Sequence, residues 1–110
     1  MSEPLSAEDA KLLTLARGAR GRISAFQGAA IRDEMGRTYS AATVDNGTVA
    51  ISALDLAVAQ AISAGARGAE AAVVVGGENV EIDGLRSLAG GGVPVYACTA
   101  AGVVTDTVLT

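Results

Sequence analysis

The sequence predicts an α/β fold in which helices pack against a mixed five-stranded β-sheet. Three observations carry this prediction: two amphipathic helical segments, a β-hairpin pattern between them, and two short apolar segments separated by a helix near the C-terminus. The expected order of elements is α-β-β-α-β-α-β-β. A strand, a helix and a second strand in succession imply a right-handed parallel crossover, while the hairpin adds an antiparallel pair.

The first helix is expected to begin after Ser6, whose hydroxyl can cap it, with Asp9 three residues later as a variant of the capping box. Strands over 26–32 and 37–44 follow. The turn between them contains Gly36, a residue type that readily adopts the positive φ of such turns. These two strands should form the β-hairpin.

The second helix has the strongest local signals in the chain. Residues 45–47 read as a loop, and Ser52 is then an N-cap with Asp55 at the position that completes the capping box. The helix is expected over 53–64 and should end at Gly65. Four apolar side chains with helical spacing are expected on its buried face: Leu54, Val58, Ala61 and Ile62.

The C-terminal third predicts one helix and three strands. Residues 71–75 form a short apolar segment between glycines, as is typical of a central strand. A short helix over 80–89 and a strand over 93–98 should follow. The last strand, over 103–109, alternates apolar and polar residues and is expected at a sheet edge.

Size and composition indicate one domain over residues 1–110, with residues 1–5 flexible. Half of the residues are hydrophobic, but the chain has one Phe, two Tyr and no Trp. Its core must therefore consist of Ala, Val, Leu and Ile. Such a core buries little area per residue, so self-association is expected to add stability.

Charge and residue usage exclude several classes of protein. The net charge of −4, the absence of a basic stripe and the few aromatic residues argue against nucleic-acid binding. Arg17, Arg20 and Arg22 are interpreted as a solvated helix end that complements the macrodipole. No apolar segment is long enough to span a membrane and no signal peptide is present, so a cytoplasmic protein is expected. Cys98 is expected to be a buried small apolar residue, since the chain has no His to activate it.

Several short segments, in this order and with this spacing, resemble the small cytidine deaminases: Gly28-Ala29-Ala30-Ile31, Met35-Gly36-Arg37, Thr43-Val44-Asp45-Asn46-Gly47, Ser52-Ala53-Leu54, Ser63-Ala64-Gly65 and Ala71-Ala72-Val73-Val74-Val75. The resemblance covers about residues 10–110. It implies a three-layer α/β/α fold and a homo-oligomer, either a dimer or a tetramer.

The departures from the family pattern fall on its chemistry. Where the family has its first zinc-binding Cys or His, this chain has Ser52, and where the family has its proton-shuttling Glu, it has Leu54. The best register places Glu81 and Gly84 at the two remaining zinc-cysteine positions. These four residues are the degenerate counterpart of the family's site.

The family's ribose-contacting Asn and Glu correspond to Thr43 and Asp45. Together with Asn46, these residues are candidates for residual ligand binding. Glu81, Asp83 and Asp45 could alternatively hold a hard cation, but solvated turn carboxylates are the interpretation we favour.

Loss of these residues removes the basis of zinc catalysis. Bound zinc lowers the pKa of its water from about 15.7 to about 7. A catalytic zinc needs about three protein ligands. We therefore expect no metal, no cofactor and no catalytic residue. Ser52 should serve as a helix cap, and Leu54 should be buried and fill the former pocket.

Three functions remain open on this reading. The first is a non-catalytic, oligomeric binding or scaffolding module. The second is a residual binder of nucleosides or other small molecules. The third is an enzyme after all, either a nominal cytidine deaminase or a different, metal-free activity.

Overall fold

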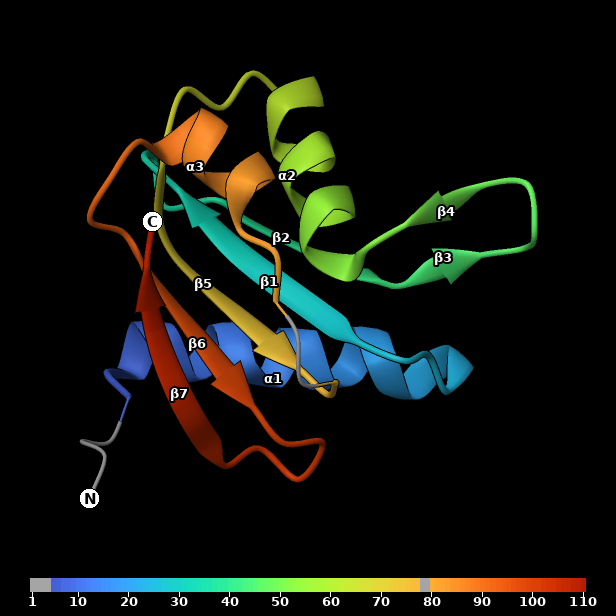
Figure 1. The fold of residues 1–110 in the computed structure, drawn as a ribbon. Coiled ribbons are helices and arrows are strands. Elements are labelled where there is room, and N and C mark those ends of the chain that lie inside the picture. The colour runs from blue at the N-terminus through green and yellow to red at the C-terminus, as the bar shows by residue number, and fades with distance from the viewer. Residues whose placement is uncertain (1–4, 78–79) are drawn as a thin grey trace.

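The β-sheet is the middle of three layers (Figure 1). Helix α1, Ala7–Ile23, covers one face, whereas α2, Ala53–Ser63, and α3, Asp83–Ala89, cover the other. The computed structural model describes residues 5–77 and 80–110. This arrangement confirms the predicted three-layer α/β/α fold. The described strands are β1 Gly28–Asp33, β2 Thr38–Ala42, β3 Val44–Asp45, β4 Ala50–Ile51, β5 Ala69–Val75, β6 Pro94–Cys98 and β7 Val104–Leu109.

The main sheet has five strands in the order β2-β1-β5-β6-β7. β5 and β6 are parallel and are joined through α3, while the other neighbouring pairs are antiparallel. In the register, Val75 at the end of β5 lies opposite both Gly28 of β1 and Cys98 of β6. The predicted mixed five-stranded sheet is confirmed, and β7 lies at an edge as expected.

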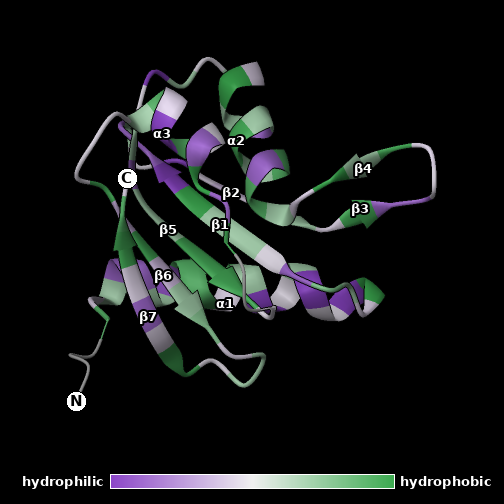
Figure 2. Cartoon of the chain, viewed as in Figure 1, coloured by the Kyte–Doolittle hydropathy of each residue, from purple (hydrophilic) through white to green (hydrophobic). Residues whose placement is uncertain are grey.

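Alternation along β5 divides the core into two clusters. Val74 packs with Leu54 beneath α2 and α3, whereas Val75 packs with Leu12 and Cys98 beneath α1. Successive strand residues point to opposite faces, so two neighbouring valines serve two separate cores. The apolar colouring of the central strands in Figure 2 follows this double burial. The predicted burial of Cys98 is confirmed.

Helix α1 lies very close to the start of β1 because residue 28 is a glycine. A β-carbon at Gly28 would collide with the carbonyl oxygen of Ala16 and would lie 2.8 Å from Cβ of Arg20. The glycine is required here for space, and any side chain would push the helix away from the sheet. Ser6 caps this helix as predicted, since its Oγ accepts a hydrogen bond of 3.1 Å from the N–H of Asp9.

The turn between β1 and β2 is organised by one buried carboxylate. Asp33 is fully buried and accepts hydrogen bonds from the N–H groups of Met35 and Arg37, from Nε of Arg37 and from the Tyr39 hydroxyl, at 2.7–2.9 Å. Burial alone raises the pKa of this carboxyl, but the four donors outweigh it and the net pKa lies below the ordinary 3.8. The predicted turn at Gly36, with a φ of +82°, is confirmed.

The expectation of a simple loop at residues 45–47 is wrong in one respect. β3 and β4 form a small antiparallel hairpin, with Val44 opposite Ile51 and Asp45 opposite Ala50, and it projects from the body of the molecule (Figure 1). Each strand has only two residues, too few for a periodic pattern to reveal them. The sequence signal at 45–47 reported the hairpin's turn but not its strands.

Two further expectations need correction. Ile62, expected on the buried face of α2, is 54% exposed. It lies about 80° around the helix from Leu54, outside the arc that the buried residues of α2 share. Helix α3 begins at Asp83 and not at residue 80. The expected flexibility of residues 1–5 falls mostly on residues 1–4, which lie outside the described residues.

Within residues 5–77 and 80–110, no helix combines the length and the apolar character needed to cross a membrane.

Candidate functional site

A pocket of about 340 Å³ lies between the end of β5, the start of α2 and the segment just before α3. We call it the α2–α3 pocket. It lies on the face of the sheet that α2 and α3 cover, at the carboxyl end of β5. Open α/β sheets commonly bind ligands at this edge. The described residues that line it are Gln27, Ser52, Leu54, Asp55, Val74, Val80 and Glu81.

Ser52 is the N-cap of α2, as the sequence predicts. Its backbone is extended, with φ −65° and ψ 154°, and its Oγ accepts a hydrogen bond of 3.1 Å from the N–H of Asp55. This bond satisfies one of the helix's unpaired N–H groups and stabilises the helix by about 1 kcal/mol. The hydroxyl is therefore engaged in holding the start of α2 at the pocket wall.

Leu54 is 2% exposed and belongs to the cluster that contains Val58 and Val74. Its predicted burial is confirmed. The expectation that it fills the pocket is wrong, because the α2–α3 pocket remains open beside it. The pocket is wider than one side chain, since three separate segments form its walls, and Leu54 supplies only an apolar part of one wall.

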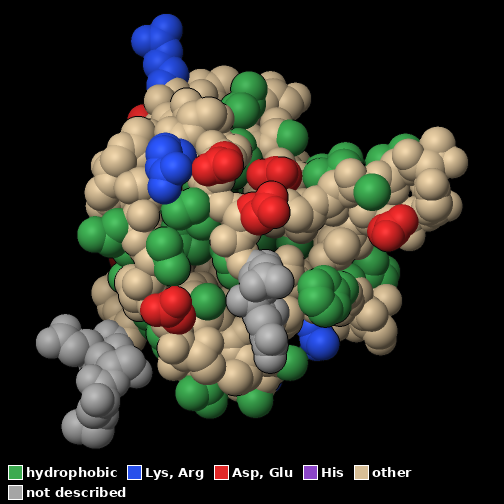
Figure 3. All heavy atoms as spheres, in the orientation of Figure 1, with side chains coloured by type: hydrophobic (Ala, Val, Ile, Leu, Met, Phe, Trp, Pro, Cys, Tyr) green, Lys and Arg blue, Asp and Glu red, His purple; other side chains and the backbone are tan. Residues whose placement is uncertain are grey.

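The other two degenerate positions lie on the α3 side. Glu81 lines the pocket and is exposed. Gly84 is the second residue of α3, and a β-carbon there would collide with the Asp55 carboxylate of α2. Gly84 thus lets the starts of α2 and α3 approach closely. Figure 3 shows acidic side chains gathered over the gap between these two helices.

Gln27 is a pocket residue that the sequence analysis missed. It is 7% exposed, and its Nε2 donates a hydrogen bond of 3.0 Å to the carbonyl oxygen of Gly76. This bond joins the start of β1 to the end of β5 at the pocket. The available signal was a single amide side chain within the otherwise apolar segment 25–31.

The candidate ligand-binding residues of the 43–46 segment are not among the described residues that line the pocket. Thr43 Oγ1 accepts from the N–H of Gln27 at 3.0 Å. In the hairpin turn, Asp45 accepts from the N–H of Gly47, and Asn46 accepts from two N–H groups further along. The Asp45 and Asn46 side chains thus shape the hairpin turn, whereas Thr43 is hydrogen-bonded to Gln27, which lines the pocket.

The donor atoms at the pocket do not fit a zinc site of the kind that the resemblance implies. Ser52 is engaged as a cap, and Leu54 and Gly84 offer no donor. Among the described residues that line the pocket, only Glu81 and Asp55 carry carboxylates. In the part of the chain that the structure describes, no group of three or more His, Cys, Asp or Glu side chains could hold a metal ion. The alternative cation site of Glu81, Asp83 and Asp45 is not formed either, because Asp45 lies on the hairpin.

The fold and pocket define a class: three-layer α/β/α domains with a pocket at the carboxyl end of a central strand. A family model described as cytidine deaminase-like matches residues 5–102. The chain therefore belongs to the cytidine deaminase-like family.

A solved structure of cytidine deaminase from Burkholderia pseudomallei is similar to this chain, with a TM-score of 0.72 and 24% sequence identity. The similarity covers 96% of this chain and 92% of that one. At this identity the likeness shows a shared fold. No curated protein matches the chain.

Proposed function

We propose that this chain is a non-catalytic, self-associating member of the cytidine deaminase-like family, and that its α2–α3 pocket binds a small molecule. The observation that carries the proposal is an open pocket at the family's site position, lined by Ser52, Leu54 and Glu81 in place of a zinc donor set. The pocket is open although its lining lacks the residues that bind zinc in the family. Binding without metal-dependent chemistry is the function that this combination supports best.

The loss of catalysis follows from the side chains. Deamination in this family needs a hydroxide at neutral pH, which a bound zinc supplies by lowering the pKa of its water. Leu54 cannot move a proton, and the Ser52 hydroxyl accepts the helix-capping hydrogen bond. Glu81 alone cannot replace three metal ligands.

The walls of the pocket indicate what kind of molecule it takes. Leu54, Val74 and Val80 offer apolar surface, while Asp55 and Glu81 supply carboxylate oxygens that accept hydrogen bonds. None of the described lining residues is Lys or Arg. A neutral or positively charged ligand with an apolar ring and several N–H or O–H donors fits these walls, and nucleosides are one such class.

Self-association is supported by the apolar surface of the chain. Several large hydrophobic side chains are exposed, among them Phe26 at 68% and Ile62 at 54%. Three of the four alanines of α2 are buried in the core of the chain, so the exposed large apolar side chains carry this argument. A scaffolding role without a small-molecule ligand is the second candidate, and this exposed apolar surface favours it.

Zinc content and deaminase activity test the loss of catalysis. We expect the purified protein to contain no stoichiometric zinc by elemental analysis and to form no uridine from cytidine. One zinc per chain, or clear uridine formation by the pure protein, would overturn this part of the proposal.

Ligand binding is tested by thermal melting with a panel of nucleosides. A ligand at 100 times its Kd should stabilise the protein by about 2.7 kcal/mol. Glu81→Gln removes one pocket carboxylate and should abolish most of this gain. Asp106→Asn, an exposed carboxylate on β7, is the matched control and should leave it unchanged. If no nucleoside raises the melting temperature, the scaffolding role takes first place.

Self-association is tested by light scattering at micromolar concentration. A dimer or a tetramer mass supports the proposal, whereas a monomer mass contradicts it. The measurement is independent of the ligand experiment, so the two parts of the proposal can fail separately.

A further inference from the structure

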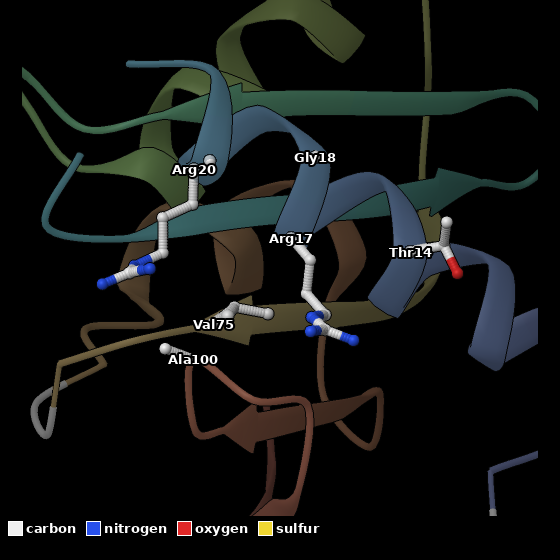
Figure 4. Close-up of a pocket in the computed structure, with 7 residues that line it drawn as sticks. Thr14, Arg17, Gly18, Arg20, Val75 and Ala100 are labelled. Atoms are coloured by element: carbon white, nitrogen blue, oxygen red, sulfur yellow. The ribbon is translucent and has the colours of Figure 1, made fainter. Parts of the chain in front are cut away.

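A second pocket, of about 380 Å³, lies on the opposite face of the sheet, beside the C-terminal half of α1. We call it the α1 pocket. Figure 4 shows Arg17 and Arg20 extending from α1 toward the end of β5 at Val75 and toward Ala100 in the β6–β7 turn. The described residues that line it are Thr14, Arg17, Gly18, Arg20, Gly21, Val75 and Ala100.

Arg17 and Arg20 are one helical turn apart, so both side chains leave α1 on the same side. Within residues 5–77 and 80–110, neither forms an ion pair with a carboxylate. Two guanidinium groups thus line one pocket in a chain whose net charge is −4. Complementing the helix macrodipole accounts for basic residues here, but it does not account for a cavity between them.

Both arginine side chains pass close to a glycine whose φ is positive. Nε of Arg20 donates to the carbonyl oxygen of Phe26 at 3.4 Å, and a β-carbon at Gly76 would lie 2.8 Å from that Nε. A β-carbon at Gly102 would lie 3.3 Å from Nη1 of Arg17. Gly76 and Gly102 have φ values of +82° and +96°. The hydrogen bond to Phe26 orients the Arg20 side chain, and Gly76 and Gly102 leave room for the two arginines.

The wall on α1 itself is kept open by two more glycines. A β-carbon at Gly21 would meet no atom within 4 Å, and one at Gly18 would meet only Nη1 of Arg22, at 3.6 Å. Neither residue has a positive φ, so neither is required by backbone geometry or by packing. Each costs the helix up to about 1 kcal/mol relative to Ala. Their one evident structural effect is to leave room beside the guanidinium groups.

The geometry points to the α1 pocket as a binding site for an oxyanion, with the phosphate group of a small phosphate monoester as the ligand class. Guanidinium groups bind phosphate oxygens through paired, charge-assisted N–H donors. The remaining volume, bounded by Val75 and Ala100, accommodates the organic part of the ester. Because Val75 and Val74 face opposite sides of the sheet, this site is separate from the α2–α3 pocket and does not rest on the function proposed above.

The test is a titration of the full chain with inorganic phosphate, followed by NMR of backbone amides and arginine Nε–H groups at constant ionic strength set with chloride. We expect saturable shifts confined to residues that line the α1 pocket. A parallel titration with ribose phosphate distinguishes the two sources of the group. Tighter binding of the ester identifies an organic phosphate, and equal binding identifies free phosphate. Shifts that do not saturate, or that chloride reproduces, overturn the proposal.

Three variants make the test specific. Arg17→Gln and Arg20→Gln should each weaken phosphate binding by about tenfold or more. Arg67→Gln removes the same charge from an exposed residue outside the pocket lining, just before β5 and at the opposite end of that strand from Val75, and it should weaken binding less than about twofold. Arg17 is exposed, so its variant will fold even if Arg20→Gln is destabilised. Equal losses in all three variants would show a diffuse charge effect and would refute a site.

Discussion

The two pockets lie at the same end of β5 but on opposite faces of the sheet, and their charges are opposite. Val74 lines the α2–α3 pocket with two carboxylates nearby, and Val75 lines the α1 pocket with two guanidinium groups nearby. Neighbouring residues of one strand therefore belong to chemically different sites. One sheet edge can present an acidic and a basic concavity with only the sheet between them.

Helix direction explains the sign of each pocket. α2 presents its N-terminus to this edge, and its first turn carries Asp55. α1 presents its C-terminal half, and its last turn carries Arg20 and Arg22. Acidic residues stabilise helix N-termini and basic residues stabilise helix C-termini. The charge contrast between the two pockets thus follows from the topology.

The largest expected effect is at the apolar wall of the α2–α3 pocket. Leu54→Ala should lower the free energy of unfolding by about 2–5 kcal/mol, because it removes a buried side chain. Leu54→Glu should cost at least as much, since burial disfavours an ionised carboxylate, and it should not restore deamination. Denaturant midpoints of both variants measure these costs.

Ile62→Ala is the matched control for this experiment. It truncates a large aliphatic side chain on the same helix, but at a position that is 54% exposed. Its effect should remain within about 0.5 kcal/mol. If Leu54→Ala behaves like Ile62→Ala, Leu54 does not form the wall that the comparison of the two pockets assumes.

The second-largest effect is expected at Asp33, a buried carboxylate that lines neither pocket. Asp33→Asn should lower the free energy of unfolding at neutral pH by about 1.5–3 kcal/mol, because it weakens hydrogen bonds to a charged group. The folded-state pKa lies below the ordinary 3.8, so ionised Asp33 stabilises the fold above pH 3.8, and this contribution is lost as the pH falls through the folded pKa.

The corresponding measurement is the urea midpoint of both proteins as a function of pH. Protonated Asp33 resembles Asn, so the two curves should converge below pH 3.8. A gap that persists in acid would mean that the loss at neutral pH comes from altered packing and not from the lost charge.

A smaller effect is expected where α1 meets the sheet. Gly28→Ala places a β-carbon against the carbonyl oxygen of Ala16, so the helix must move. The cost should be about 1–3 kcal/mol, as for other overpacked sites. Because Arg17 and Arg20 move with α1, we also expect weaker phosphate binding. Unchanged stability in thermal denaturation would show that α1 is free to shift.

The smallest effect has the opposite sign. Gly21→Ala should stabilise the protein by about 0.5–1 kcal/mol, since it improves helix propensity and meets no neighbouring atom. It makes the same chemical change as Gly28→Ala at a position of α1 where the added carbon has open space. Destabilisation by Gly21→Ala would mean that the space beside this glycine is filled.

Local signals were the predictable part of this molecule. The caps at Ser6 and Ser52, the turn at Gly36 and the burial of Leu54 each depend on a few neighbouring residues. The order of elements followed from them, and with it the five-stranded sheet. Helix caps, turns and buried helix faces depend on residues that are close in sequence, so a single sequence is enough to predict them.

The pockets depend on residues that are distant in sequence. Gln27 reaches the α2–α3 pocket through a hydrogen bond to Gly76, which is 49 residues away. Arg20 was interpreted only as part of a helix end, because nothing near it in sequence shows that Gly76 would lie against it. The resemblance drew attention to residues 43–46; Asp45 and Asn46 lie on the hairpin, whereas Thr43 is hydrogen-bonded to the pocket residue Gln27.

The projecting β3–β4 hairpin makes its tip a convenient place for insertions. Its two strands pair with each other and not with the main sheet, and Gly47 and Thr48 at the turn are exposed. Exposed loop tips of this kind tolerate inserted sequence well. A peptide tag or a fluorophore placed between these two residues would extend from the body without entering either core. Energy transfer between such labels on different copies would then measure the geometry of any assembly that the chain forms.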